Sequence, residues 1–264
     1  MTTGYGDSEP RPRVLHVDDD ESFLDLVAAF LVDRHGFEVV SVSTVGEGLD
    51  VLADADCSVE CVVSDYEMPG ADGLEFLRRV REVAPDLPFV LYTGRGSESV
   101  AADAIAAGVT EYIQKETGTA QYAVLANRIE QAVDRYRADR RADRRAVALE
   151  SAREGIALLD ADGRFEYVNP AYAALYQHEP QTLRGADWRT VHPDSAVEHI
   201  ESEVLPAVDA DGGWSGTSTG LRADGSTFPE AKSIRPVPGG GYVIVVWDRS
   251  RRHRQFSTRR PADD

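Results

Sequence analysis

The chain has 264 residues, of which 42% are hydrophobic and 28% charged, and its formal net charge is −18. This balance is that of an ordinary globular protein with one or two domains. No apolar run approaches the roughly 18 residues of a membrane helix, and the N-terminus lacks the apolar core of a signal peptide. So acidic a chain also opposes binding to nucleic-acid phosphates. We therefore expect a cytoplasmic protein that binds neither membrane nor DNA.

The acidic residues are concentrated in the first half of the chain, where residues 1–118 carry 24 acids and 8 bases. Only two of the bases in the whole chain are lysines, Lys115 and Lys232. An acid-rich, lysine-poor composition resembles that of proteins from salt-adapted archaea, and a high-GC genome also favours arginine over lysine. The two explanations are compatible, and a haloarchaeal source is our expectation.

Short apolar segments alternate with amphipathic helical patterns through the first 115 residues. The apolar segments cover 14–17, 37–42, 61–63, 89–92 and 112–113. Fully apolar strands that alternate with amphipathic helices predict a parallel sheet covered on both faces. The expected fold is α/β, a (βα)5 doubly wound parallel sheet.

Residues 119–150 read as one long helix that is apolar at its start and strongly charged over 137–145. A helix too polar to be buried usually bridges domains or pairs with a partner helix. The basic run is interrupted by Asp139 and Asp143, so we interpret it as a solvated connector and not as a nucleic-acid contact.

The second half of the chain has a different order of predicted strands and helices. Strand patterns cover 155–159, 165–168, 214–221, 227–234 and 242–247, and a helical stretch covers 170–208. Two strands, several short helices and three further strands predict an α+β domain with a five-stranded antiparallel sheet. The predicted segments are a disordered N-terminus at 1–12, a parallel-sheet domain at 13–135, a connector helix at 136–150, the α+β domain at 151–249 and a basic polar tail at 250–264.

Polar residues follow four of the five predicted parallel strands. Asp18 and Asp19 follow the first, Asp65 follows the third, Thr93 ends the fourth and Lys115 ends the fifth. The carboxyl ends of parallel strands share one edge of the sheet, where ligands bind. Carboxylate oxygens are the ligands that Mg²⁺ prefers, and a hydroxyl and an ammonium can hold phosphoryl oxygens. This set predicts phosphoryl transfer to a carboxylate.

Four segments resemble the response-regulator receiver family. They are V-D-D-D-E at 17–21, D-Y-E-M-P-G-A-D-G at 65–73, Y-T-G at 92–94 and Y-I-Q-K at 112–115. The resemblance covers about residues 11–135. It implies that Asp65 is the phosphorylated nucleophile, that Thr93 bonds the phosphoryl group, that Lys115 pairs with it, and that Tyr112 is the switch aromatic.

The same resemblance implies the metal ligands. Asp18, Asp19, Asp65 and the backbone carbonyl of Glu67 would hold Mg²⁺. Two positions depart from the family pattern. Glu116 stands where members commonly have proline, and Gly94 where they often have alanine; the effect of these two residues on switching is left open.

The second half resembles a PAS domain through residues 151–172, H-P-D at 192–194, R-A-D-G-S at 222–226 and V-V-W-D at 245–248. The resemblance leaves the ligand open between haem, flavin, a small metabolite and none. No cysteine follows Cys61, which excludes the flavin type that forms a cysteine adduct. Haem needs an axial ligand, usually histidine, and His178, His192 and His199 are the candidates. An empty pocket or an interaction and dimerisation surface is the leading interpretation.

The leading hypothesis is a two-component response regulator that accepts a phosphoryl group from a histidine kinase onto Asp65 and passes the change through the connector to the PAS domain and a downstream signalling protein. The chain has no kinase core and no helix-turn-helix pattern, so we expect no enzyme beyond self-catalysed phosphorylation and dephosphorylation, and no DNA partner. A homodimer through the connector or the PAS domain is left open. The alternatives are a PAS-driven ligand or redox sensor with a vestigial receiver, and an Mg²⁺-dependent phosphatase with Glu67 as the additional acid.

Overall fold

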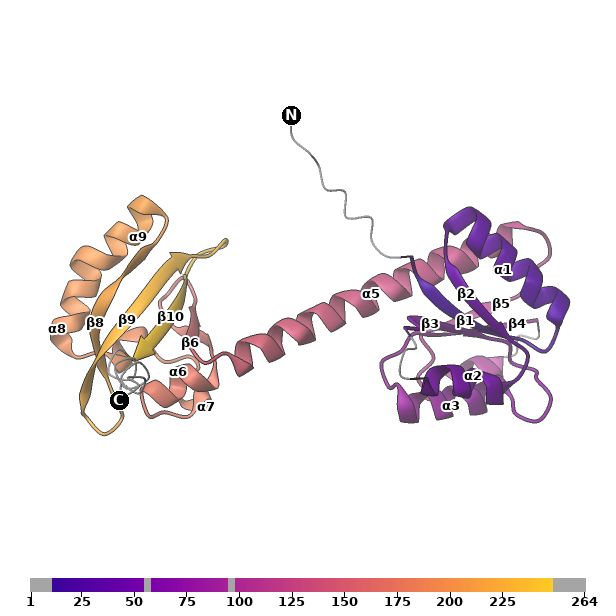
Figure 1. Ribbon diagram of the computed structural model, residues 1–264, viewed down its shortest axis with the longest axis horizontal. Helices are drawn as coiled ribbons and strands as arrows, with labels where there is room; N and C mark the ends of the chain where they lie inside the picture. Colours follow the sequence, from indigo (N-terminus) through magenta and orange to yellow (C-terminus); the bar gives the residue numbers. More distant parts are fainter. Residues whose placement is uncertain (1–10, 55–57, 95–97, 249–264) are drawn as a thin grey trace, which may run out of the picture. The chain divides into compact units, whose positions relative to one another are not determined.

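The computed structural model describes residues 11–54, 58–94 and 98–248, and the chain divides into two compact units, Met1–Ala142 and Asp143–Asp264 (Figure 1). One helix, α5 (Ala120–Ser151), runs across the division. Among the described residues, none of the helices combines the length and the hydrophobicity needed to cross a membrane.

The first unit is built on a parallel sheet of five strands in the order β2-β1-β3-β4-β5. The strands are β1 (Arg13–Val17), β2 (Glu38–Val42), β3 (Cys61–Ser64), β4 (Phe89–Thr93) and β5 (Glu111–Gln114). Every residue of β3 and β4 is buried. Burial on both faces explains why these strands appear in the sequence as unbroken apolar runs and not as alternating patterns.

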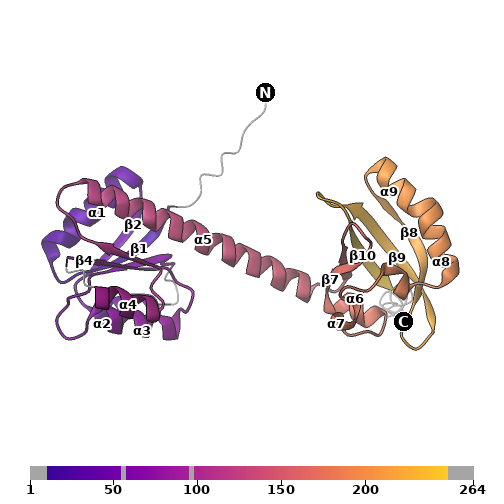
Figure 2. The same ribbon diagram turned by 180° about the vertical axis from the view of Figure 1, so that it is seen from behind.

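Helices cover both faces of this sheet (Figures 1 and 2). Helices α1 (Glu21–His35) and α5 lie on one face, and α2 (Val45–Ala53), α3 (Gly73–Val83) and α4 (Glu98–Ala106) lie on the other. Each face has its own core: Val14, Val63 and Tyr92 pack toward α1 and α5, whereas Leu15 and Leu91 pack toward the other three helices. Successive strand residues point to opposite faces, so one strand serves both cores.

Side-chain caps set where the helices begin. The Asp20 carboxylate accepts the backbone N–H groups of Ser22 and Phe23 at the start of α1. Asp72 accepts the N–H of Glu75 at the start of α3. Such caps satisfy backbone donors that have no partner inside the helix. Of the three consecutive aspartates at 18–20, Asp20 therefore serves the helix, which leaves Asp18 and Asp19 for the edge of the sheet.

The second unit contains an antiparallel sheet of five strands in the order β7-β6-β10-β9-β8. The strands are β6 (Gly155–Leu159), β7 (Phe165–Val168), β8 (Trp214–Leu221), β9 (Thr227–Pro236) and β10 (Tyr242–Asp248). Between β7 and β8 the chain forms α6 (Pro170–Leu175), α7 (Pro180–Leu183), the 3-10 helix η1 (Trp188–Val191), α8 (Asp194–His199), the π-helical turn η2 (Ile200–Val204) and α9 (Leu205–Asp211).

One hydrophobic core joins these helices to one face of the sheet. It includes Leu159, Phe165, Tyr176, Val204 and Ile234. Asn169 holds the first helix in place, because its side chain accepts the N–H of Tyr172 and donates to the carbonyls of Leu149 and Glu154.

The predicted fold class is confirmed in both units, from the parallel α/β sheet through the long helix to the five-stranded antiparallel sheet. The helical stretch extends past the predicted residue 208 to Asp211, and it is broken into short pieces that include 3-10 and π turns. Residues 1–10 of the predicted N-terminal segment and the predicted tail at 250–264 lie outside the described residues, as do residues 95–97 beside Gly94.

Candidate functional site

The predicted site residues lie at the carboxyl ends of the parallel strands. Asp18 follows β1, Asp65 follows β3, Thr93 ends β4 and Lys115 follows β5. Backbone hydrogen bonds continue the sheet at this edge: the Asp65 N–H donates to the Val17 carbonyl at 2.8 Å, and the Lys115 N–H donates to the Thr93 carbonyl at 2.7 Å. The sheet itself therefore fixes the positions of these residues.

The Lys115 ammonium joins two of the carboxylates. Its Nζ donates to Asp18 Oδ2 and to Asp65 Oδ1, each at 2.7 Å. The same nitrogen lies 4.1 Å from the centre of the Phe23 ring, which supports it from α1. Because both oxygens contact one nitrogen, they lie no more than twice 2.7 Å apart. The prediction that these three residues meet agrees with this geometry.

The two carboxylates are largely shielded from water, since Asp18 is 2% exposed and Asp65 7%. Burial raises the pKa of Asp18 above its ordinary value, although hydrogen bonding and charge from Lys115 oppose that change. With both carboxylates ionised, one ammonium leaves the trio with a net negative charge. Such an arrangement favours a second cation beside the carboxylates.

The Asp65 carboxylate is fixed on its other side by its own loop. Its Oδ2 accepts the Glu67 N–H at 2.7 Å, and its carbonyl accepts the Ser64 hydroxyl at 2.8 Å. Gly73 lies close against this loop: a Cβ built there would stand 2.3 Å from the Asp65 carbonyl oxygen. The glycine at the end of the D-Y-E-M-P-G-A-D-G segment therefore allows α3 to begin directly behind the candidate nucleophile.

The structure brings together part of the ligand set expected for Mg²⁺. Asp18 and Asp65 supply adjacent hard oxygen ligands, and the Lys115 ammonium between them shows that a cation can be held there. Asp19 lies on the same loop but is exposed. Across the described residues, no three His, Cys, Asp or Glu side chains are gathered closely enough to bind a metal. The donor set fits Mg²⁺, and the described arrangement brings two of its carboxylates together.

The other predicted residues lie beside this trio. Thr93 is buried, with 1% of its surface exposed. Tyr112 is half-buried on β5 and packs against the core under α2, α3 and α4. Gln121 organises the loop after Lys115, because its side-chain oxygen accepts the Glu116 N–H at 2.9 Å and the Tyr92 hydroxyl at 2.6 Å. Neither Gln121 nor Phe23 was predicted to be a site residue, because each lies within a predicted helical segment.

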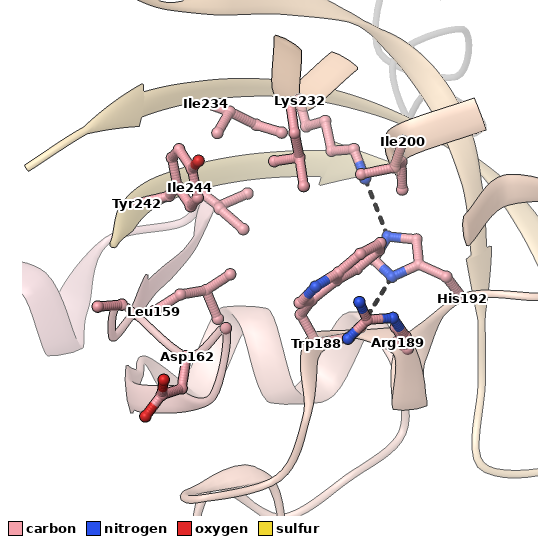
Figure 3. A pocket seen from close by; sticks show the side chains of 13 residues that line it. Leu159, Asp162, Trp188, Arg189, His192, Ile200, Lys232, Ile234, Tyr242 and Ile244 are labelled. Carbon is pink, nitrogen blue, oxygen red and sulfur yellow. Dashed lines mark hydrogen bonds between the residues drawn. The ribbon is translucent and has the colours of Figure 1, made fainter. Parts of the chain in front are cut away.

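In the second unit the three candidate histidines have different surroundings. His192 is buried, and its Nδ1 lies 3.0 Å from the Trp188 carbonyl while its Nε2 lies 2.9 Å from Lys232 Nζ. His178 is half-buried, and His199 contacts Glu203 at 3.5 Å. His192 borders a cavity of about 230 Å³ between the sheet and the helices (Figure 3).

Two further buried charges were missed from the sequence. Glu230 is fully buried and Lys232 is 2% exposed, and their side chains form an ion pair at 2.7 Å. The signal was present, because Phe228, Glu230, Lys232 and Ile234 alternate along β9 and all four are buried. A strand whose inward positions begin and end with apolar residues places the charged residues between them inside.

Comparison with known proteins matches residues 14–127 to the response regulator receiver domain and residues 149–254 to the PAS fold. Transcriptional regulatory protein FixJ of Bradyrhizobium diazoefficiens is 35% identical over 99 residues, which is 38% of this chain and 47% of that protein. The bacterioopsin transcriptional activator of Halobacterium salinarum is 28% identical over 227 residues, 80% of this chain and 33% of that protein.

A solved structure of a response regulator receiver domain protein from Clostridium thermocellum is 28% identical to this chain. The match covers 48% of this chain and 97% of that one, with a TM-score of 0.44. The chain spans less than half the length of the two curated relatives named above.

Proposed function

Because the chain carries a response regulator receiver domain over residues 14–127 followed by a PAS fold over 149–254, we propose that it is a two-component response regulator with Asp65 as its phosphoacceptor. The observation that carries the proposal is the contact of Lys115 Nζ with both Asp18 and Asp65 at the carboxyl edge of the parallel sheet. The expected phosphoryl donor is the phosphohistidine of a histidine kinase. We expect a downstream protein to respond to the phosphorylated chain.

In the proposed reaction, an oxygen of the Asp65 carboxylate forms a bond to phosphorus while the phosphorus–nitrogen bond of the phosphohistidine breaks. The Lys115 ammonium contacts negative charge before and after the transfer. It donates to Asp65 Oδ1 before the transfer and can donate to a phosphoryl oxygen afterwards. The Glu67 N–H holds Oδ2 and limits rotation of the carboxylate. The Thr93 hydroxyl is the further donor expected for the phosphoryl group.

The residues that would hold Mg²⁺ are Asp18, Asp19, Asp65 and the Glu67 carbonyl. When bound, the cation would neutralise part of the negative charge that builds up as an anionic phosphoryl group approaches a carboxylate. The net negative charge of the Asp18, Asp65 and Lys115 trio supports this expectation.

We expect α5 to transmit the structural change that phosphorylation causes in the receiver domain. Arg137 on this helix donates through Nε to Glu60 Oε1 at 2.7 Å, and both side chains are mostly buried. Glu60 immediately precedes β3, the strand that ends at Asp65. A movement of Asp65 can therefore reach Glu60 along β3, and Glu60 holds α5 through Arg137.

The test is phosphotransfer from a set of purified, radiolabelled histidine kinases to the full chain, to Asp65→Asn and to a control, Asp72→Asn. Asp72 caps α3 close to the site, and asparagine is an equally good cap. We expect label on the wild type and on Asp72→Asn, and none on Asp65→Asn. Equal labelling of Asp65→Asn, or no labelling of the wild type by any kinase, would contradict the proposal.

A further inference from the structure

We propose that the cavity beside Lys232 in the second unit binds a small, uncharged, mainly apolar molecule of about one aromatic ring, which accepts a hydrogen bond from the Lys232 ammonium through an oxygen atom. This inference goes beyond the proposed function. It does not depend on the phosphoacceptor.

Most of the cavity wall is apolar. Leu159, Trp188, Ile200, Ile234, Tyr242 and Ile244 line it. Figure 3 shows Leu159 and Trp188 with Ile234 and Ile244 around the same space. A ligand that displaces water from such a wall gains stability in proportion to the apolar surface that it buries. The body of the ligand is therefore hydrophobic.

One side of the wall carries a hydrogen-bond donor. Lys232 Nζ donates to Glu230 Oε1 at 2.7 Å and to His192 Nε2 at 2.9 Å, and among the described residues these two atoms are its acceptors. An ammonium has three donors, so the third remains for a ligand oxygen. Lys232 lines the cavity although it is 2% exposed, which places that donor away from competing bulk water.

His192 adds no second donor. Its Nδ1 lies 3.0 Å from the Trp188 carbonyl, which accepts a hydrogen bond only if Nδ1 carries the proton. Its Nε2 lies 2.9 Å from Lys232 Nζ and 3.2 Å from Glu230 Oε1, so both ring nitrogens face partners within the core. The cavity wall therefore offers one hydrogen-bond donor, the Lys232 ammonium, and a matching ligand carries one hydrogen-bond acceptor.

The charges around the cavity favour a neutral ligand. Glu230 already accepts from Lys232, from the Tyr176 hydroxyl and from the Ser218 hydroxyl, so its pair with Lys232 is balanced within the core. A carboxylate placed beside this pair would be a buried charge without a counter-charge of its own, which is costly. At the mouth, Arg189 is held by Asp187 at 2.9 Å and by Glu201. Asp162 lines the mouth as a further negative group.

The size of the cavity sets the size of the ligand. Its 230 Å³ exceeds the cavity of about 150 Å³ that holds benzene in an engineered protein and lies below the roughly 300 Å³ at which pockets for drug-sized ligands begin. A substituted single ring fits these limits. Haem and flavin are larger and would require the helices to move.

The test is titration calorimetry on the full chain with four probes that share one ring. Acetophenone is neutral with an acceptor, ethylbenzene is neutral without one, benzoate is anionic and benzylamine is cationic. We expect acetophenone to bind, ethylbenzene to bind about tenfold more weakly because it lacks one hydrogen bond to a charged donor, and no heat of binding from the two ions. Benzoate or benzylamine binding as tightly as acetophenone, ethylbenzene binding equally well, or no probe binding at all would overturn the inference.

Two variants locate the site. Lys232→Met removes the donor and should reduce acetophenone binding to the level of ethylbenzene. Since this change also removes a partner of Glu230 and can unfold the unit, Leu205→Phe serves as the second variant. It narrows the cavity from α9 without touching the charged pair, and it should abolish binding of both neutral probes. Leu158→Phe, at a half-buried strand position outside the cavity lining, is the matched control and should bind as the wild type does.

Retained acetophenone binding in Leu205→Phe would place the binding elsewhere and overturn the inference. Phosphorylation of the same samples keeps the two proposals separate. If the cavity inference fails, Asp65 is still labelled, whereas an unlabelled wild type with normal acetophenone binding counts against the phosphoacceptor alone.

Discussion

Replacing Lys115 with methionine should destabilise the first unit strongly in the absence of divalent cations. Methionine keeps an unbranched side chain that is one atom shorter, and it removes the ammonium that joins Asp18 to Asp65. Two buried carboxylates would then face each other without the cation that joins them.

The magnitude follows from the geometry in two ways. The facing oxygens lie no more than twice 2.7 Å apart, and at that separation two unit charges repel by about 3 kcal/mol at an effective dielectric constant of about 20. Loss of one partner of a buried ion pair typically costs about 3–5 kcal/mol. The Lys115 side chain keeps 19% of its surface exposed, which favours the lower end of this range. We expect the free energy of unfolding to fall by about 3 kcal/mol.

The assay must follow the first unit alone. All three tryptophans, Trp188, Trp214 and Trp247, lie in the second unit, so tryptophan fluorescence does not report on the receiver. Hydrogen exchange read by mass spectrometry on peptides from β1, β3 and β4 does. A loss of 3 kcal/mol speeds exchange through global opening about a hundredfold. Added Mg²⁺ should slow exchange more in the variant than in the wild type, because the cation can take the place of the ammonium.

Arg79→Met is the matched control, since Arg79 pairs with Glu75 across one turn of α3 with about half of both side chains exposed. Such surface pairs contribute about 0.3–0.5 kcal/mol. If Lys115→Met exchanges no faster than Arg79→Met in EDTA, the ammonium does not hold the two carboxylates together and the reasoning is wrong.

Three further changes test other contacts. Gly73→Ala should lower stability by about 1–3 kcal/mol and slow phosphorylation, because its Cβ would meet the Asp65 carbonyl and push the nucleophile's loop away; acetyl phosphate labelling and thermal unfolding measure both. Arg137→Met should increase hydrogen exchange across the middle of α5, because it removes the charged hydrogen bonds to Glu60, which contribute about 1.5–3 kcal/mol. Glu230→Gln should weaken the acid sensitivity of the second unit. Burial alone would raise the pKa of Glu230, but hydrogen bonds and charges from His192 and Lys232 hold it below its ordinary 4.5. Stability from this group is therefore present above pH 4.5 and lost below it, as tryptophan fluorescence at falling pH would show.

Each of these changes has a comparison that should behave differently. In Gly46→Ala on α2, the new Cβ would make an ordinary contact of 3.9 Å with the Thr44 hydroxyl oxygen, so this change should leave labelling unchanged. Arg128→Met breaks only an exposed contact of 3.8 Å with Glu111 and should leave exchange in α5 unchanged. The pH argument fails if wild type and Glu230→Gln lose tryptophan signal in parallel between pH 5 and pH 3.

Much of the fold could be predicted from the sequence, because the hydrophobic pattern of each segment matches the burial of that segment in the structure. Unbroken apolar runs such as Phe89–Thr93 are buried on both faces, and the polar residues after them lie at the edge that parallel topology requires. That topology places Asp18, Asp65 and Lys115 at the same edge of the sheet.

Other features depend on three-dimensional contacts that no local pattern encodes. The bridging position of Lys115 depends on the Phe23 ring, and the loop after Lys115 depends on Gln121 from α5. In the second unit, the charged side chains of Glu230 and Lys232 occupy positions where composition favours exposure. These positions are favourable because Glu230 and Lys232 pair with each other and both contact His192, and because Glu230 also accepts hydrogen bonds from the Tyr176 and Ser218 hydroxyls.

The measurement that tests the central claim most directly is the intact mass of the full chain after incubation with acetyl phosphate, with Mg²⁺ or with EDTA. We predict one added phosphoryl group in Mg²⁺, its removal by hydroxylamine as expected of an acyl phosphate, and no addition in EDTA or in Asp65→Asn. An unchanged mass in Mg²⁺, or a phosphoryl group that appears in Asp65→Asn or resists hydroxylamine, would contradict the assignment of Asp65.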